Sequence, residues 1–318
     1  MLATVAAGTF LFGLSAAFES KSQKFDSAFP DESTRPSESV LPDGSSPLNV
    51  LVVGSDSRGA SSDLAESGEA SDQRSDTMML VHIPADRKKM YVVSVMRDLW
   101  VPIPGHGEAK INAALAFGGV PLMVQTVEGF LQQRIDHVVF IDFDGFKKLT
   151  NVVGGVDVDV PLAFKPSGGP IDNFTKGPMH MDGDAAFWFV HERYAFADGD
   201  FQRTRNQQLY FRALFTKIAS RDVLSNPFTV SSMVNDFAPY LTVDSGLDAS
   251  TIASMAYELR EIRPDDVVSF TLPTNGTGWS ADGQSIVLPN QAAADALSRA
   301  MAEGTMAQYV AEQVTVTK

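Results

Sequence analysis

The stretch DTMMLVHIPADRKKMYVVSVM, residues 76–96, contains two short apolar runs joined by a polar connection. The runs 76–83 and 90–96 are rich in Val, Met and Ile, which predicts two buried strands. The connection PADRKK (84–89) is typical of a tight turn, and short connections favour antiparallel pairing. A further apolar run, NVLVVG (49–54), ends in Gly and predicts the strand that precedes them. We therefore expect an antiparallel meander of three strands.

This meander would bring charged residues to one rim of the sheet, because the end of the first strand, the start of the second and the end of the third meet there. The five residues at these positions are Asp56, Arg74, Asp76, Arg97 and Asp98. Neighbouring carboxylates repel unless arginines or a cation neutralise them, and an all-oxygen ligand set favours Mg²⁺ or Mn²⁺. One hypothesis is a cation site in which Asp56 and Asp76 are the better-placed pair. The alternative is a salt-bridge lattice that binds nothing, with Asp76 on Arg97 and Arg74 on Asp98.

A second charged cluster lies in HERYAFADGDFQRTRNQQ, residues 191–208. Arg203 and Gln207 share one face if a helix begins by Arg203, and the turn ADGD can fold Arg193 toward them. The planar fork of arginine matches phosphate oxygens, and several arginines together suit a pyrophosphate. The alternative is that these arginines pair with the nearby acids, which are Glu192, Asp198 and Asp200.

Helices and strands interleave along the rest of the chain. The predicted elements are helical stretches within 107–134 broken at Gly118-Gly119, a strand at 137–143, a helix at 144–155, a strand at 156–160, helices at 182–195 and 204–220, and a mixture of both types in 221–318. This order predicts an α/β or α+β single domain with a central sheet. The Phe-, Met- and Leu-rich segments 111–131 and 209–215 are interpreted as ordinary core, with an apolar pocket as the alternative.

The N-terminal part of the chain predicts two further segments. Residues 1–18 contain seventeen consecutive uncharged residues, Leu2 to Phe18. As a helix they would span about 26 Å against about 30 Å of hydrocarbon, which favours a transmembrane anchor over a cleaved signal peptide or a buried helix. Residues 19–47 are rich in Ser, Pro, Asp and Glu and predict a flexible linker. The folded domain is then expected at 48–318.

Composition excludes several classes of protein. The chain of 318 residues has 39 Asp and Glu against 25 Lys and Arg, a formal charge of −14, which argues against general nucleic-acid binding. It has no cysteine, so disulfides and thiolate metal sites are excluded. The sequence also lacks the HExxH, GxxxxGK[ST] and GxSxG motifs.

Several blocks in one order resemble the LytR-CpsA-Psr family of cell-wall glycopolymer ligases. They are NVLVVGSDSR, QRSDTMMLVHI, VVSVMRDLWVPIPG, KINAALAFGG, VVGGVDVDV, MDGDAAFWFVHERY and GDFQRTRNQQ, from about residue 48 to 220, with weaker similarity to about residue 300. The resemblance implies an α/β domain with a mixed central sheet flanked by helices, held at the cell membrane by a single N-terminal helix and lying outside the cytoplasm. It implies transfer of a glycopolymer, such as teichoic acid, capsule or arabinogalactan, from a polyprenyl-pyrophosphate carrier to peptidoglycan. The product is a phosphodiester, and polyprenyl phosphate is released.

The resemblance also implies roles for individual residues. Asp56 and Asp76 match Mg²⁺-binding aspartates. The positions that match pyrophosphate-binding residues are Arg74, Arg97, Arg193, Arg203 and Gln207, with Lys110 as a further contact. An apolar tunnel would hold the prenyl chain. His191 stands where the family often has Arg, so the pyrophosphate would meet one fixed charge less, or a pH-dependent one.

In the implied reaction a sugar hydroxyl attacks the sugar-linked phosphorus, and Arg97 stabilises the charge on the leaving group. A carboxylate must take the proton of that hydroxyl, and Asp98 and Asp200 are both candidates. Two other functions are the alternatives. One is a polyprenyl-pyrophosphate phosphohydrolase, for which water replaces peptidoglycan as the acceptor. The other is a lipid-binding or regulatory protein without catalysis. Addition of Mg²⁺ would then leave the bound lipid unchanged.

Overall fold

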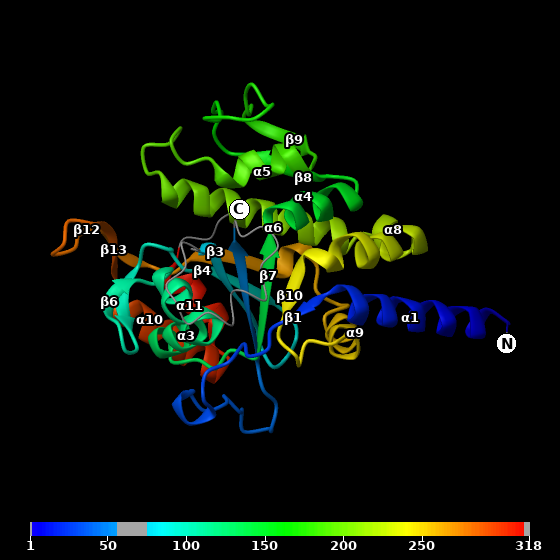
Figure 1. Cartoon of the computed structure of the whole chain (residues 1–318), viewed down its shortest axis with the longest axis horizontal. Helices are drawn as coiled ribbons and strands as arrows, with labels where there is room; N and C mark the ends of the chain where they lie inside the picture. Colours follow the sequence, from blue (N-terminus) through cyan, green and yellow to red (C-terminus); the bar gives the residue numbers. More distant parts are fainter. Residues whose placement is uncertain (1, 56–74, 315–318) are drawn as a thin grey trace.

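The computed structural model describes residues 2–55 and 75–314, which form an α-β-α domain around one mixed sheet (Figure 1). The order of the seven strands is β1 (Gln23–Lys24), β10 (Leu241–Val243), β7 (His137–Asp142), β2 (Leu48–Ser55), β3 (Ser75–Ile83), β4 (Met90–Ser94) and β11 (Val267–Thr271). Strands β2, β3 and β4 pair antiparallel in sequence order, so the predicted meander is confirmed. Strands β7 and β11 join its two sides in parallel.

Helices cover both faces of this sheet (Figure 1). On one face lie α3 (Ala113–Leu131), α10 (Gln291–Glu303) and α11 (Met306–Gln313); on the other lie α4 (Phe143–Val152), α5 (Gly183–His191), α6 (Asp200–Ile218) and α9 (Ala249–Glu258). Because side chains alternate along a strand, β2 serves both layers. Leu51 and Val53 pack in the core with α3, whereas Val50 packs with residues of α6. The predicted fold class is therefore confirmed.

The remaining elements are short. Three two-stranded sheets are formed by β5 (Trp100–Ile103) with β6 (Gly107–Lys110), β8 (Val156–Val160) with β9 (Gly177–Met181), and β12 (Thr274–Trp279) with β13 (Ser285–Pro289). The short helices are η1 (Glu32–Thr34), α7 (Arg221–Leu224), α8 (Pro227–Ser232), η2 (Met233–Phe237), η3 (Ala238–Tyr240) and η4 (Pro264–Asp266). The sequence predicted one of these strands, at 156–160, but none of the three two-stranded sheets.

Helix α3 is broken at Gly118 and Gly119, as the sequence predicts. Gly119 has φ 65°, a conformation that favours glycine, and a Cβ on Gly118 would lie 2.6 Å from Cδ2 of Leu122. By length and composition, α3 is also apolar enough to cross a membrane. Most of it is buried in the core of the domain, where Val120, Met123 and others contact the sheet layer, so it is interpreted as a core helix.

Helix α1 (Leu2–Lys21) projects from the domain, and its N-terminal end lies away from the body (Figure 1). Its last turns pack against the domain, since Phe18 is buried with Ala238, Val243 and Leu247. Phe12, further toward the N-terminus, is exposed. The predicted anchor at 1–18 stays a prediction.

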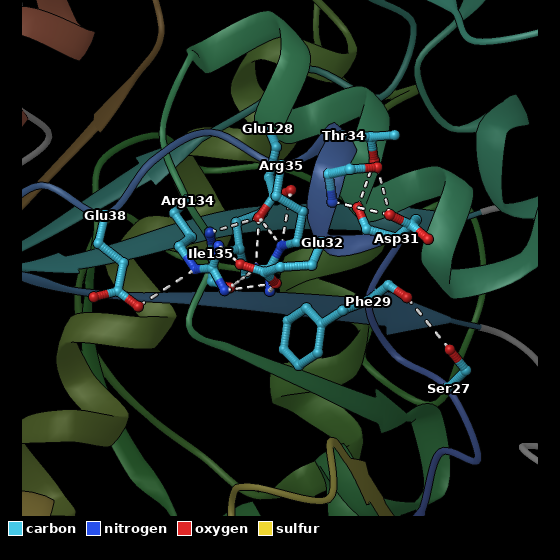
Figure 2. Close-up of polar contacts among 11 residues, drawn as sticks. Ser27, Phe29, Asp31, Glu32, Thr34, Arg35, Glu38, Glu128, Arg134 and Ile135 are labelled. Carbon is cyan, nitrogen blue, oxygen red and sulfur yellow. Dashed lines mark hydrogen bonds and ion pairs between the residues drawn. The ribbon is translucent and has the colours of Figure 1, made fainter.

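Residues 19–47 pack against the domain instead of forming the predicted flexible linker. Strand β1 pairs with β10, and the next residue, Phe25, is 3% exposed with its ring edge-on to Phe140 at 5.2 Å. Arg35 forms an ion pair with Glu128 of α3 at 2.7 Å, and both side chains are buried (Figure 2). The prediction of a flexible linker was wrong because polar side chains of this segment form ion pairs and hydrogen bonds with the domain.

Candidate functional site

Three arginine side chains converge on the carboxylate of Asp200. Its Oδ2 lies 3.1 Å from Nε of Arg97 and 3.1 Å from Nη2 of Arg203, and its Oδ1 lies 3.6 Å from Nη1 of Arg193. Arg97 follows β4, Arg193 follows α5, and Arg203 lies in the first turn of α6. Two consecutive helices and a strand far from them in the sequence thus bring three guanidinium groups to one place. We call these four residues, together with Asp98 and Lys110, the charged cluster.

Asp98 and Lys110 form the second part of the charged cluster. Nζ of Lys110, at the end of β6, lies 3.2 Å from Oδ1 of Asp98, and Nε of Arg97 lies 3.9 Å from Oδ2 of Asp98. The cluster contains four cationic and two anionic side chains. Its described side chains therefore carry a local excess of positive charge in a chain whose formal charge is −14. Such an excess favours an anionic ligand.

Asp200 is held in its ionised form. Burial by itself would raise the pKa of this carboxyl, but the charges of Arg203, Arg97 and Arg193 outweigh burial and lower the pKa. A carboxylate with a lowered pKa is a weak proton acceptor. The carboxylate of Asp200 bridges the three guanidinium groups.

The expected alternative, pairing of arginines with nearby acids, also occurs in this region. Arg193 and Arg203 pair with Asp200, and Arg205 pairs with Asp198. Glu192 is not such a partner in the contacts described: its carboxylate accepts hydrogen bonds from the backbone N–H groups of Ser167 and Ala195. Pairing with Asp200 does not neutralise the site, because one carboxylate serves three guanidinium groups.

The first half of α6 is buried although it is polar. The helix begins at Asp200, four residues before the predicted start, so Arg203 and Gln207 lie one turn apart on one face. Nε2 of Gln207 donates to the carbonyl oxygen of Val190 at 3.3 Å. The other buried polar residues here are Gln202, Thr204, Asn206 and Gln208. The hydrogen bond from Gln207 to Val190 contributes to fixing the position of Arg203 relative to the end of α5.

Sequence reasoning missed Asn206 and Gln208, which position this helix. Nδ2 of Asn206 donates to the carbonyl oxygen of Phe189 at 3.1 Å, which ties α6 to α5. Nε2 of Gln208 donates to Oγ of Ser94 at 2.8 Å, which ties α6 to β4. The sequence does contain a signal for these residues, which is a run of amide side chains in the first half of a predicted helix. This half of the helix has no apolar face, so polar contacts must hold it in place.

An apolar cavity of about 130 Å³ lies between the sheet and helices α4, α5 and α6. Residues of its wall include Val52, Met79, Phe146, Tyr210, Phe211 and Leu214. Gln207 also lines the cavity, one helical turn from Arg203, so the cavity lies next to the charged cluster. Segment 209–215 thus contributes to a pocket, whereas segment 111–131 is ordinary core.

His191, which stands where the resemblance led us to expect an arginine, belongs to the wall of this cavity. Its ring stacks on Phe187 with centroids 4.0 Å apart and meets Phe143 edge-on at 4.5 Å. Its Nδ1 lies 2.8 Å from the carbonyl oxygen of Phe187. The imidazole therefore contributes an aromatic surface to the apolar cavity.

The predicted metal ligands are only partly covered by the structure. Asp56 and Arg74 lie outside the described residues, and of Asp76 the backbone alone is described. That backbone forms a bulge in β3 between the register pairs Gly54–Thr77 and Ser55–Ser75, beside the end of β2 that leads to Asp56. Within the described part of the chain, no group of three or more His, Asp or Glu side chains could hold a metal ion. A cation site at Asp56 and Asp76 stays a prediction.

Fold and site together define an α-β-α domain with a cluster of mainly cationic side chains at the edge of an apolar cavity. The chain belongs to the LytR_cpsA_psr family, whose model matches residues 14–303. It is 31% identical over 244 residues to the polyisoprenyl-teichoic acid–peptidoglycan teichoic acid transferase TagU of Enterococcus faecalis, a match that covers 75% of this chain and 73% of the relative. It is 33% identical over 260 residues to the probable cell wall biosynthesis protein LcpB of Corynebacterium glutamicum, which covers 80% of this chain and 60% of that one.

Solved structures share the fold. Bacillus subtilis TagV superposes with a TM-score of 0.66 at 24% identity, over 82% of this chain and 97% of TagV. A structure of TagT bound to LIIa-WTA superposes with a TM-score of 0.64 at 25% identity, over 86% of this chain and 98% of TagT.

Proposed function

We propose that this chain transfers a glycopolymer from a polyprenyl-pyrophosphate carrier to peptidoglycan and releases polyprenyl phosphate. The observation that carries the proposal is the meeting of Arg97, Arg193 and Arg203 around one carboxylate, beside an apolar cavity. A prenyl diphosphate has the same two parts, an anionic headgroup and an apolar tail. The name of the E. faecalis relative describes transfer of teichoic acid from a polyisoprenyl carrier to peptidoglycan, which supports this choice of substrate class.

The diphosphate binds through the guanidinium groups of the charged cluster. Arginine forks offer paired N–H donors to phosphate oxygens, and charge-assisted bonds of this kind are about twice as strong as neutral ones. The cluster lies at the N-terminal end of α6, where the helix dipole adds further attraction for an anion. The prenyl chain enters the cavity past Gln207. The enzyme acts at the cell membrane, with this domain outside the cytoplasm.

The transfer itself is a displacement at phosphorus. An acceptor hydroxyl oxygen forms a bond to the sugar-linked phosphorus, the bond from that phosphorus to the bridging oxygen breaks, and prenyl phosphate leaves. Arg97 and Arg203 stabilise the charge that develops on the leaving group. The proton of the hydroxyl passes to Asp98, because the carboxylate of Asp200 is engaged by three guanidinium groups and has a lowered pKa. Lys110 orients Asp98 from 3.2 Å.

Asp56 and Asp76 are the residues that would hold Mg²⁺. Their two carboxylates would supply oxygen ligands only, which suits Mg²⁺ or Mn²⁺. The ion would supply positive charge that helps neutralise the two phosphates.

Removal of divalent ions with EDTA is expected to reduce transfer about 10²-fold or more, because a bound metal contributes several kcal/mol of charge stabilisation. Addition of excess Mg²⁺ or Mn²⁺ should restore the rate, and Asp76→Asn should stay slow at any Mg²⁺ concentration. Rates of product formation with carrier-linked donor and peptidoglycan measure both effects. Full activity in EDTA would rule out the metal site.

Filling the cavity should weaken binding of the prenyl chain and leave binding of the headgroup intact. Val52→Phe adds an aromatic ring to a cavity of about 130 Å³. We expect its affinity for farnesyl pyrophosphate to fall about tenfold, within the 1–3 kcal/mol range typical of overpacking. Affinity for inorganic pyrophosphate, measured by calorimetry on the same sample, serves as the control and should not change. Equal loss for both ligands, or no loss for either, would place the prenyl chain elsewhere.

Incubation of purified chain with carrier-linked donor, with and without peptidoglycan, tests the function directly. Polymer should become attached to peptidoglycan, and prenyl phosphate should be released only when the acceptor is present. Release that does not depend on the acceptor would favour a phosphohydrolase instead.

A further inference from the structure

A β-hairpin with an exposed tryptophan extends from the charged cluster. Strands β12 and β13 form the hairpin, which stands out from the body of the domain (Figure 1), and Trp279 at the end of β12 is 75% exposed. In the middle of β13, the backbone N–H of Val287 donates to the carbonyl oxygen of Asp98 at 2.8 Å, and Leu99 and Val287 form a β-bridge. Thr277 pairs with Val287, so Trp279 lies two residues, about 7 Å along the strand, from this junction.

The tip of the hairpin is held by hydrogen bonds. The backbone N–H of Ser280 donates to the carbonyl oxygen of Gln284 at 2.9 Å, and that of Gly283 donates to the carbonyl oxygen of Ser280 at 3.0 Å. Nε2 of Gln284 donates to Oδ2 of Asp282 at 2.7 Å. At the base, Nδ2 of Asn275 donates to the carbonyl oxygen of Pro289 at 2.9 Å. Trp279 is therefore presented by a fixed turn.

A single exposed aromatic residue is common on protein surfaces and by itself indicates nothing. Here a second one also adjoins the charged cluster: Tyr194 is 75% exposed, and the guanidinium of Arg193 lies over its ring, 4.7 Å from the centroid. Nη2 of Arg193 also donates to the hydroxyl of Tyr194 at 2.7 Å. Tyr194 thus contacts the side chain of one cluster residue, Arg193, and Trp279 lies on a hairpin bonded to the main chain of another, Asp98.

The chemistry of the hairpin suits a saccharide. The face of an indole ring is electron-rich, and the C–H groups on the face of a pyranose ring are the weakly positive, apolar surface that packs on it. Asp282 and Gln284 at the same tip provide a carboxylate and an amide for sugar hydroxyl groups. A macromolecule with an apolar face of its own would need a larger apolar patch than one indole.

We propose that the β12–β13 hairpin, through Trp279, binds the glycan strand of the peptidoglycan acceptor. The assignment rests on the proposed function. The hairpin is bonded to the main chain of Asp98, the residue whose carboxylate takes the acceptor's proton in the proposed function, whereas the donor's headgroup is held by the guanidinium groups around Asp200. A sugar stacked on Trp279 is thus held by a hairpin anchored to the main chain of Asp98, and not by the arginines that hold the donor.

Binding of a soluble tetrasaccharide of alternating N-acetylglucosamine and N-acetylmuramic acid tests this proposal, with farnesyl pyrophosphate as the probe of the donor site. Trp279→Ala should raise the Kd for the tetrasaccharide about three- to tenfold, the range given by one lost aromatic contact. Its Kd for farnesyl pyrophosphate should stay unchanged, and Trp279→Tyr should retain most of the glycan affinity. The matched control is Tyr257→Ala, which removes an exposed aromatic side chain on α9.

Unchanged glycan affinity in Trp279→Ala would overturn the proposal, as would a wild-type chain that does not bind the tetrasaccharide. Weaker binding of both probes in Trp279→Ala would also overturn it, because the hairpin would then serve the donor site. A wild-type chain that binds the glycan through Trp279 but does not bind farnesyl pyrophosphate would support the glycan site and contradict the proposed function.

Discussion

Replacement of Arg203 by alanine is expected to reduce transfer about 10²- to 10³-fold, and replacement of Arg97 to do the same. Both guanidinium groups lie 3.1 Å from the carboxylate of Asp200, at the position where the departing prenyl phosphate gains charge in the proposed reaction. Loss of one donor from a preorganised site of this kind typically costs about 10²–10³ in kcat. Initial rates at saturating donor and acceptor measure the loss.

The matched control for this prediction is Arg212→Ala. Arg212 lies on the same helix as Arg203 and pairs with the exposed Asp265 at 3.1 Å, away from the cluster. Its removal should leave the rate unchanged. Thermal unfolding of all three variants separates loss of catalysis from loss of fold. A folded Arg203→Ala or Arg97→Ala variant with the wild-type rate would refute the assigned role.

Replacement of Glu128 by alanine is expected to lower the free energy of unfolding by about 3–5 kcal/mol. The carboxylate of Glu128 is buried, and it accepts from Nη2 of Arg35 at 2.7 Å and from the backbone N–H of Ile135 at 2.9 Å (Figure 2). Removal of one partner of a buried pair leaves the other charge buried without compensation, which typically costs this amount. Urea denaturation of the whole chain measures the change.

The control for Glu128 is a second ion pair of the same network. Arg134 lies 2.6 Å from the carboxylate of Glu32, a closer contact than that of Arg35 with Glu128, but Glu32 is largely exposed (Figure 2). Exposed pairs contribute little to stability because water and salt screen them. Arg134→Ala should therefore cost much less than Glu128→Ala. Similar losses for the two variants would show that burial does not decide the strength of these pairs.

The meander and the start of the site could be predicted from the sequence because both depend on local patterns. Runs 76–83 and 90–96 are joined by a connection too short for anything but neighbouring strands, and the rim that carries Arg97 and Asp98 follows from that topology. Arg203 and Gln207 are separated by one helical turn, so their common face follows from spacing alone. The position of Arg193 depends on the turn before α6, which brings it to Asp200.

Other features could not be predicted because they depend on partners distant in sequence. Strand β1 has two residues and pairs with β10, more than two hundred residues later, so neither segment has a pattern of its own. Residues 19–47 have the composition of a linker, and partners distant in sequence such as the buried Glu128 fix Arg35 in place. Similarly, nothing in TNGTGWSADGQS (274–285) shows that this hairpin joins the main chain at Asp98.

A crystal structure of this chain with geranylgeranyl pyrophosphate tests the central claim most directly. The account predicts diphosphate oxygens within hydrogen-bond distance of Arg97, Arg193 and Arg203, and a prenyl chain that passes Gln207 into the cavity lined by Val52. A prenyl chain outside that cavity, or a diphosphate bound away from these three arginines, would contradict it.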